Sequence, residues 1–379
     1  MMRQYPISRQ EGFTLTELMV ALTVGLIVLS GLTSAYVSSS HAGREQQAKS
    51  EQVENGRLAL EYLGYDLHHA GYYGQLTSVA AAGVSLPDPC EIADLPAMLE
   101  SLAFPVQGYD SPAASPIGCL DEDDFVPGTD VLVVRRVSTE PLAPGDSPQQ
   151  GAIYLQSNSS GSELQIGNGS AAVGTTLKAD GTNATLMNRG GVTAAPIRQY
   201  LVQIYFVAPC AMPADGGMNC TGAADDDGNP IPTLKRMQLT AAGGAVKWSI
   251  VPLVAGIENL QFDYGVDDLP ADADLLTGLA GDGAPDCSDT DPGSPGNAGV
   301  TAGCAAGNPG AVQTWANVVQ VKASVLTRSY RSYAGYTDSK TYELGLGTPA
   351  LIPGGAFKRH AYSTTVRVTN VSSRREIPL

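Results

Sequence analysis

The stretch from Gly12 to Ser40 reads GFTLTELMVALTVGLIVLSGLTSAYVSSS. Residues 18–40 within it carry no charged side chain, and a helix of that length would be ~35 Å long, enough to cross a hydrocarbon core of ~30 Å. The leader before it, residues 1–12, holds two arginines and one glutamate. Since basic residues keep their own end of a membrane helix in the cytoplasm, the sequence predicts a single membrane span. The residues after the span are expected outside the cytoplasm.

The composition narrows the classes of protein that fit the rest of the chain. With 43% hydrophobic and 16% charged residues, the chain has enough apolar side chains for a folded core and does not read as a disordered protein. The formal net charge is −16 and no cluster of lysine or arginine occurs. Direct nucleic-acid binding is therefore not expected, because it needs a basic face. A second membrane span is not expected either, since no other stretch is long and apolar enough.

Glu17 is a carboxylate inside the apolar segment that begins at Phe13. An ordinary cleaved secretory signal is one interpretation, with residues 33–35 as a small-residue cleavage site. Against it, a charge at membrane depth costs several kcal/mol unless it is paired, so Glu17 is expected to have a specific partner. If the chain were cut between Gly12 and Phe13, the new amino terminus of a neighbouring subunit would provide that partner.

The hexapeptide GFTLTE at residues 12–17, followed by the apolar run, resembles a type IV prepilin signal. The resemblance implies that prepilin peptidase cuts after Gly12, that the exposed Phe13 is N-methylated, and that Glu17 guides assembly into a filament. It also implies a single-pass inner-membrane protein with a periplasmic domain before assembly, which becomes part of an extracellular pilus afterwards.

A single long helix is predicted for residues 13–70, because no proline interrupts it and apolar residues recur at helical spacing in its second half. Residues 18–40 would form its membrane-spanning part, and the amphipathic second half would pack against a globular domain. Several glycines count against the helix, since each costs ~1 kcal/mol relative to alanine in a helix interior. The apolar stripe consists of Val53, Leu60, Leu63 and Leu67.

After the helix the sequence changes to short β-rich runs separated by Gly, Pro, Asp and Ser loops. This order predicts an α+β fold: a pilin-like lollipop whose long N-terminal helix, membrane-spanning and then amphipathic, packs on an antiparallel β-sheet domain with long loop insertions. The predicted strands are residues 131–134, 200–207, 234–239, 246–251, 318–326 and 362–368. The predicted division is a leader at 1–12, the helix at 13–70, a connecting loop region at 71–130, and a β-rich domain at 131–379 with insertions at 208–233 and 265–314.

Four further segments, residues 60–74, 254–267, 315–319 and 365–370, resemble PilW-type minor pilins. This resemblance implies a low-copy subunit near the pilus tip that primes assembly together with other minor pilins, the major pilin and a tip adhesin. It would thereby contribute to twitching motility, adhesion or DNA uptake. Two alternatives stay open. A type II secretion minor pseudopilin shares the processing signal, and a membrane-anchored periplasmic or surface binding module would never polymerise.

The six cysteines are expected to form disulfides, because the chain after the span is expected outside the cytoplasm. None forms a C-x-x-C motif, and the four histidines are too few and too scattered for a typical zinc site. Six cysteines allow many connectivities, and pairing neighbours in sequence places each bridge in or beside a long loop. The candidate pairs are Cys90–Cys119, Cys210–Cys220 and Cys287–Cys304.

Acidic clusters raise the hypothesis of a calcium site, because Ca²⁺ selects oxygen ligands. The run at residues 225–229 starts like an EF-hand loop, but Pro230 and Arg236 stand where that loop needs its glycine and its glutamate. A richer acidic set follows further along, for which a solvated surface loop is the favoured interpretation. No other cofactor is expected. The speculative calcium ligands are Asp263, Asp267, Asp268, Asp272 and Asp274.

The protein is not expected to be an enzyme, and no catalytic residue is assigned. The sequence lacks the motifs of the common serine hydrolases, zinc proteases and P-loop enzymes. The pair His68-His69 is interpreted as a packing and capping feature at the helix end. A stretch rich in Tyr and Arg at residues 328–342 is a candidate surface contact, although a hairpin whose tyrosines cover the sheet is favoured. Its candidate contact residues are Tyr330, Arg331, Tyr333 and Tyr336.

Overall fold

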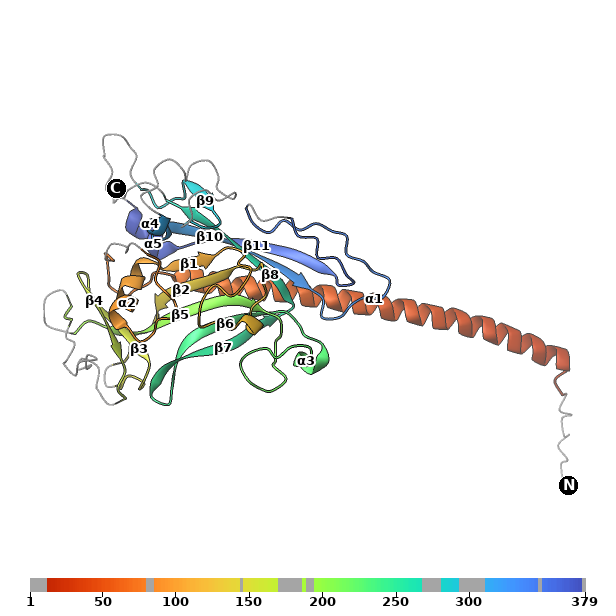
Figure 1. The fold of residues 1–379 in the computed structure, drawn as a ribbon. Helices are drawn as coiled ribbons and strands as arrows, with labels where there is room; N and C mark the ends of the chain where they lie inside the picture. Colours follow the sequence, from red (N-terminus) through yellow and green to blue (C-terminus); the bar gives the residue numbers. More distant parts are fainter. Residues whose placement is uncertain are drawn as a thin grey trace, which may run out of the picture. The chain divides into compact units, whose positions relative to one another are not determined.

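The structure is a computed structural model that describes residues 12–79, 85–143, 146–169, 186–188, 194–267, 281–292, 311–346 and 350–376 (Figure 1). The chain divides into two compact units, Met1–Glu51 and Gln52–Leu379. Helix α1 (Leu15–His69) contributes to both units, and all other helices and strands belong to the second.

The predicted long helix is confirmed as α1. Within the second unit, α1 buries residues at intervals of three and four, which form one face of the helix. Leu63 and Leu67 belong to this face as predicted, and Leu60 packs at its edge. The prediction for Val53 is wrong, because this side chain is 54% exposed. The buried face consists instead of Gln52, Gly56, Ala59, Leu63, Asp66 and Leu67.

The first sheet is built around β5 (Ile197–Ala208) and contains seven antiparallel strands. Its other members are β1 (Val106–Tyr109), β2 (Val131–Val137), β3 (Ile153–Ser157), β4 (Ser162–Ile166), β6 (Thr233–Ala242) and β7 (Ala245–Ala255). Strand β2 pairs along one edge of β5, while β3 and β6 share the other edge, β3 at the start of β5 and β6 at its end. Strands β1, β4 and β7 extend the sheet outward from β2, β3 and β6.

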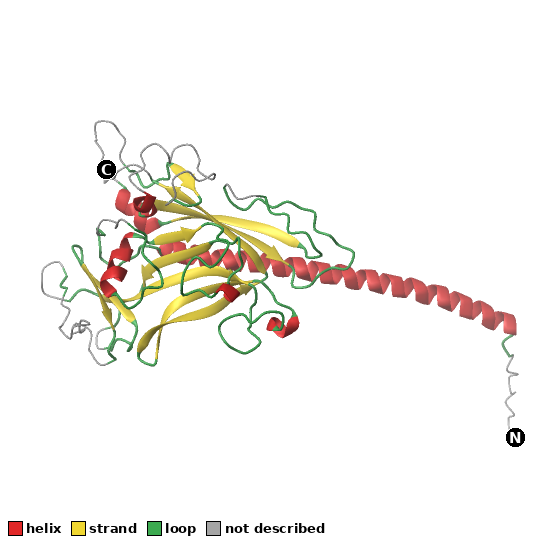
Figure 2. Cartoon of the chain, in the orientation of Figure 1, coloured by secondary structure: helices red, strands yellow, loops and turns green. Residues whose placement is uncertain are grey.

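The second sheet has the order β11-β10-β8-β9, again with every pair antiparallel. Its strands are β8 (Ile257–Val266), β9 (Cys287–Asp289), β10 (Val318–Arg328) and β11 (Arg359–Arg367). Figure 2 shows the strands of both sheets gathered around the part of α1 that lies in the second unit. All of the strands predicted from the sequence are present, and half-buried and exposed residues alternate along the second half of β11.

The centre of the first sheet is buried on both faces, as β2 shows. Successive side chains of a strand point to opposite sides of the sheet. On β2, Leu132 and Val134 pack with α1 and with the second sheet. Val131 and Val133 pack on the opposite side, where the chain between α1 and β2 covers the sheet. This two-sided burial explains why β2 reads as a continuous apolar run rather than as an alternating one.

The region between residues 71 and 130 was expected to be a connecting loop, but it contains regular elements. They are α2 (Leu95–Glu100), the 3₁₀ turns η1 (Ser101–Ala103) and η2 (Glu122–Asp124), and strand β1. Helix α2 begins at Asp94, whose side chain accepts a hydrogen bond from the Ala97 N–H, with Pro96 in the first turn. An N-cap aspartate followed by a proline in the first turn is a local signal for a short helix, which long apolar periodicity does not reveal.

Gly56 allows close contact between α1 and the second sheet. A Cβ atom at this position would overlap the ring of Tyr362 on β11. We therefore expect Gly56→Ala to lower the free energy of unfolding by about 1–3 kcal/mol, because overpacking outweighs the ~1 kcal/mol gain in helix propensity. Gly43→Ala is the matched control, since no described atom lies within 4 Å of its Cβ position. Thermal melts of the full chain should show destabilisation only for the first, and equal melting temperatures would contradict the contact.

A buried carboxylate ties α1 to the first sheet. Asp66 is 1% exposed, and its carboxylate lies 2.9 Å from the guanidinium of Arg136 on β2 and 3.5 Å from that of Arg236 on β6. The Tyr205 hydroxyl on β5 donates to the same carboxylate, and so does the Gln203 amide in the orientation that satisfies both its oxygen and its nitrogen. One helical carboxylate thus joins three neighbouring strands, and its burial is compensated by two cations.

Asp130 links the two sheets. Its N–H donates to the Leu260 carbonyl at 2.9 Å, and its carboxylate accepts from the N–H groups of Ser111 at 2.8 Å and Phe262 at 2.6 Å. Burial raises the pKa of Asp130 to about 8. The two N–H donors favour the charged form and so oppose this rise, but burial has the larger effect.

The raised pKa of Asp130 predicts a pH dependence of stability. The folded state holds the proton up to about pH 8, whereas the unfolded chain loses it near its ordinary pKa of 3.8. The stabilising contribution is therefore complete below the unfolded value and lost as the pH rises to about 8. We expect the free energy of unfolding to fall between about pH 5 and about pH 8 more steeply in the natural chain than in Asp130→Asn. Urea unfolding at each pH tests this, and parallel profiles of the two chains would contradict it.

The C-terminal helix α5 (Thr369–Arg375) closes the end of α1. The Asn370 amide donates to the Ala70 carbonyl at 3.2 Å, and the Arg374 guanidinium donates to the Gly71 carbonyl at 2.7 Å. Both carbonyls follow His69, the last residue of α1, and the Asn370 amide also lies 3.5 Å from the His68 carbonyl inside the helix. The last carbonyls of a helix have no partner within it, so α5 supplies donors to the final turn of α1 and to the residues just after it.

Candidate processing and assembly site

Thr14 and Glu17 hold the first turn of α1 by reciprocal hydrogen bonds. The Thr14 N–H donates to Glu17 Oε2 at 2.9 Å, and the Glu17 N–H donates to Thr14 Oγ1 at 3.3 Å. This arrangement is a capping box, which satisfies backbone N–H groups that have no partner inside the helix. The T-x-x-E spacing is its signature in the sequence. Glu17 is therefore bonded within its own chain, in addition to any role toward a neighbour.

The apolar start of α1 is exposed. Among the described residues, α1 alone is long and apolar enough to cross a membrane, and none of its most apolar window is buried within the protein. Apolar surface of this extent favours a lipid or protein environment over water. The exposed large side chains of this segment are Phe13, Leu15, Leu18, Met19, Val20, Leu22, Val24, Leu26, Ile27, Val28, Leu29, Leu32, Tyr36 and Val37.

The peptide bond between Gly12 and Phe13 lies just before the helix. Both residues are exposed and neither is helical, so this bond lies outside regular structure, where a peptidase can reach it. Cleavage at this bond would convert the Phe13 amide into an ammonium group next to the start of α1. The structure contains a single chain, so pairing of that ammonium with Glu17 of a neighbour stays a prediction.

Two family models match this chain. The model described as Prokaryotic N-terminal methylation motif matches residues 7–33, which include Gly12, Phe13 and Glu17. The model described as Type IV Pilus-assembly protein W, PilW, matches residues 222–370. The two matches support a PilW-type, type IV pilin-like protein. No curated protein and no solved structure gives a significant match.

The PilW match covers strands β6 to β11 and so includes the whole second sheet. Three of the segments that resemble PilW-type pilins, residues 254–267, 315–319 and 365–370, fall inside it. The fourth, residues 60–74, lies outside it and carries Asp66 together with the end of α1. The PilW match, the N-terminal match and the observed elements together confirm the predicted pilin-like α+β fold, a long N-terminal helix with antiparallel sheets.

Two of the candidate disulfides are present in the structure, Cys90–Cys119 and Cys210–Cys220. Cys287 is disulfide-bonded as well, but its expected partner Cys304 lies outside the described residues. The two local bridges each close a loop of the second unit. The first loop contains α2, η1 and β1, and the second lies within the insertion at residues 208–233.

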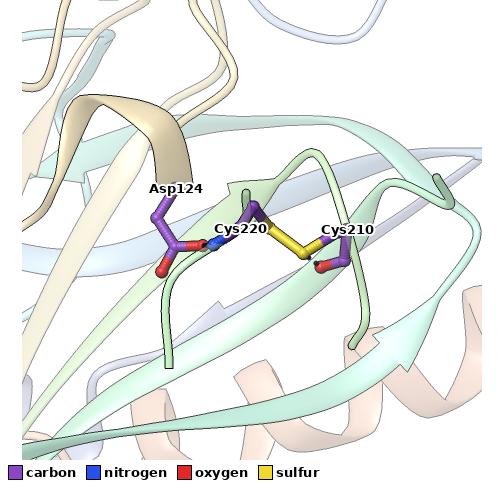
Figure 3. A group of neighbouring side chains, drawn as sticks. All are labelled: Asp124, Cys210 and Cys220. Carbon is purple, nitrogen blue, oxygen red and sulfur yellow. Dashed lines mark hydrogen bonds between the residues drawn. A yellow bond between two sulfur atoms is a disulfide. The ribbon is translucent and has the colours of Figure 1, made fainter. Parts of the chain in front are cut away.

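The Cys210–Cys220 bridge lies beside a buried carboxylate, as Figure 3 shows for Asp124, Cys210 and Cys220. Asp124 accepts from the Cys220 N–H at 3.1 Å and pairs with the ammonium of Lys235 at 2.9 Å. The two sulfurs are bonded to each other and Lys235 already neutralises the carboxylate, so this group does not offer the thiolate ligands of a metal centre. It is a buried ion pair that packs under the bridge.

The two described members of the speculative calcium set are engaged by protein groups. Asp263 accepts from the Lys322 ammonium at 3.0 Å and from the Leu346 N–H at 2.7 Å. Asp267 pairs with the Arg375 guanidinium at 2.9 Å. Asp268, Asp272 and Asp274 lie outside the described residues. Calcium binding therefore stays an untested hypothesis, and Asp263 and Asp267 would have to exchange their present partners to take part.

Asp225 and Asp226, in the acidic run at residues 225–229, accept hydrogen bonds that order the insertion around them. Asp225 accepts from the Thr221 hydroxyl and from the N–H groups of Ala214 and Gly222. These hydrogen bonds, that of Thr221 foremost, hold the pKa of Asp225 at about 2. Asp226 accepts from the N–H groups of Met212 and Ile231.

The Tyr/Arg-rich segment forms a loop between β10 and β11 whose tyrosines make contacts within the chain. The Tyr330 hydroxyl accepts from the Asn55 amide of α1 at 2.8 Å. The Lys358 ammonium lies 4.6 Å from the centre of the Tyr333 ring and 5.6 Å from that of Tyr336. All three tyrosines are half-buried, which favours the structural role. Among the candidate contact residues Arg331 is exposed, and its contact with a partner stays a prediction.

His68 and His69 form part of the closed end of α1. His69 Nδ1 lies 2.8 Å from the Tyr65 carbonyl, and His68 Nδ1 lies 3.2 Å from the Thr369 hydroxyl of α5. These contacts match the packing and capping role expected from the sequence.

Proposed function

We propose that this protein is a minor pilin of a type IV pilus that acts in the initiation of assembly, within the complex at the pilus tip. The observation that carries the proposal is the exposed apolar start of α1, with Glu17 and the N-terminal methylation motif, in a chain that also carries a PilW domain. The proposed function arises from polymerisation, and catalysis has no part in it.

The proposed sequence of events starts with insertion of the apolar helix into the inner membrane and cleavage by prepilin peptidase after Gly12. The helices of neighbouring subunits, other minor pilins and then the major pilin, would pack laterally through their apolar faces. Glu17 would be neutralised by the amino group of an adjacent Phe13. Extraction from the bilayer would be compensated by burial of the same apolar surface between helices. We propose a periplasmic location of the β-rich domain before assembly and an extracellular one afterwards.

Twitching motility, adhesion and DNA uptake would follow from such a role, with a tip adhesin as a further partner. A type II secretion minor pseudopilin is the alternative that shares the same helix and processing signal. A membrane-anchored binding module, the third candidate, would keep its leader or be cut by ordinary signal peptidase.

The test is to shear surface filaments from cells and to measure the mass of the N-terminal peptide of this protein in the filament fraction. A peptide that begins at N-methylated Phe13 supports the pilin function. The same peptide found in the envelope and never in filaments would favour the pseudopilin. An uncut leader, or a start near Tyr36, would refute both.

A further inference from the structure

Adjacent residues on β2 place two arginines on opposite faces of the first sheet. Arg136 faces α1 and pairs with Asp66 at 2.9 Å. Arg135 faces the other side and is 1% exposed. Its guanidinium donates to the Phe104 carbonyl at 2.9 Å and to Gln107 Oε1 at 2.8 Å, both of which are neutral acceptors. Within the described part of the chain, no carboxylate forms an ion pair with Arg135. A buried charge without a counter-charge is unfavourable, so this guanidinium has unused capacity for an anion.

Arg135 lines a cavity of about 300 Å³. One wall is the loop from Ser85 to Glu91, which the Cys90–Cys119 bridge holds in place, and another is α2. Apolar side chains of Met98, Phe104 and Val202 line it as well. A disulfide, a capped helix and a central strand therefore shape this cavity.

The charges around the cavity are of both signs. Asp88, Glu91 and Glu100 also line it, and all three are exposed, whereas Arg135 is buried. A simple anion would be attracted by the guanidinium and repelled by three carboxylates. A simple cation would be attracted by the three carboxylates and repelled by the guanidinium. A molecule with one charge of each sign avoids both conflicts, because opposite charges meet at each end.

We propose that this cavity binds a short zwitterion that carries a carboxylate and an ammonium group at the two ends of an apolar linker, as in an ω-amino acid. The carboxylate is held by Arg135, whose planar guanidinium suits paired hydrogen bonds to a carboxylate. The linker packs against Met98, Phe104 and Val202. The ammonium lies at the exposed carboxylates of Asp88, Glu91 and Glu100. This site is independent of the pilin function and lies in the part of the chain outside the PilW match.

The experiment is titration calorimetry of the full chain in detergent with three probes that share a six-carbon chain: 6-aminohexanoate, hexanoate and hexylamine. The zwitterion should bind most tightly, hexanoate about tenfold more weakly through loss of one charge pair, and hexylamine without measurable heat. Arg135→Gln should abolish binding of the two probes that carry a carboxylate, 6-aminohexanoate and hexanoate. Ala97→Leu, which fills the cavity from α2 and leaves Arg135 intact, should weaken the zwitterion by about tenfold or more through steric exclusion.

Glu61→Gln is the matched control, because Glu61 is an exposed carboxylate of α1 and does not line the cavity. It should bind 6-aminohexanoate like the natural chain. Thermal melts of each variant verify that it is folded, and Ala97→Leu keeps the test decisive if Arg135→Gln does not fold. Absence of heat with all three probes overturns the proposal. So does hexylamine binding equal to that of the zwitterion, or unchanged affinity in Ala97→Leu.

Discussion

Glu17→Ala is expected to yield a chain that inserts in the membrane and is cut after Gly12 but enters filaments at about one-tenth of the natural level or less. Without the carboxylate, the ammonium group of a neighbouring Phe13 would lie unpaired in an apolar environment. Such a charge costs several kcal/mol, and each ~1.4 kcal/mol is a factor of ten in an equilibrium. Immunoblots of sheared filaments against envelope fractions measure the effect.

Two further variants separate the charge from the capping box. Glu17→Gln keeps an oxygen that accepts from the Thr14 N–H, since glutamine also serves in a capping box, but it removes the charge. Thr14→Ala keeps the charge and removes the hydroxyl that accepts from the Glu17 N–H. We expect the glutamine variant to assemble as poorly as Glu17→Ala and the alanine variant at position 14 to assemble well. The reverse result would show that Glu17 acts by starting the helix, and normal piliation by Glu17→Ala would refute the proposed pairing.

Asp66→Ala is expected to lower the free energy of unfolding by about 3–5 kcal/mol, the cost of removing one partner from a buried ion pair. The substitution would leave Arg136 buried and unpaired, and Arg236 would lose the same carboxylate. The Tyr205 hydroxyl would also lose its acceptor. Urea unfolding of the full chain in detergent, followed by the fluorescence of the two tryptophans, measures the change.

The control for Asp66→Ala is Glu61→Ala on the same helix. Glu61 pairs with Arg57 at 4.0 Å, and both side chains are more than half exposed. An exposed pair of this kind contributes only about 0.3–0.5 kcal/mol. A loss for Asp66→Ala as small as that for Glu61→Ala would mean that the Asp66 cluster does not hold α1 against the first sheet.

Much of this fold could be predicted from the sequence, because its main elements have strong periodic patterns. The charge-free run and the absence of proline predict α1, and apolar or alternating runs predict β2, β5, β6, β7, β10 and β11. Of the candidate site, Gly12, Phe13 and Glu17 were found by their local motif. The T-x-x-E spacing of Thr14 and Glu17 also predicts the capping box.

The remaining features depend on contacts between distant residues. The buried face of α1 includes Gln52 and Gly56. Because neither is a large apolar residue, a pattern of large apolar residues predicts Val53 as the buried residue of this turn instead. The strand predicted at residues 131–134 stops before Arg135 and Arg136, yet both residues belong to β2 and are buried, because the centre of the first sheet is covered on both faces. Their different partners follow from the pleat of β2 and from Asp66, which lies 70 positions away.

The closure of α1 by α5 sets an order for the folding of the second unit. The two disulfides join residues 29 and 10 positions apart, whereas Asn370 and Arg374 reach carbonyls 300 and 303 positions away. Loop closure costs more entropy as the intervening chain lengthens, and contacts between distant residues slow folding. We therefore expect the bridges to form while the chain is still incomplete and the end of α1 to be covered last. Until then the carbonyls of Ala70 and Gly71 stay without these donors, so the end of α1 is expected to exchange its amide hydrogens more readily than the part of the helix that the sheets cover.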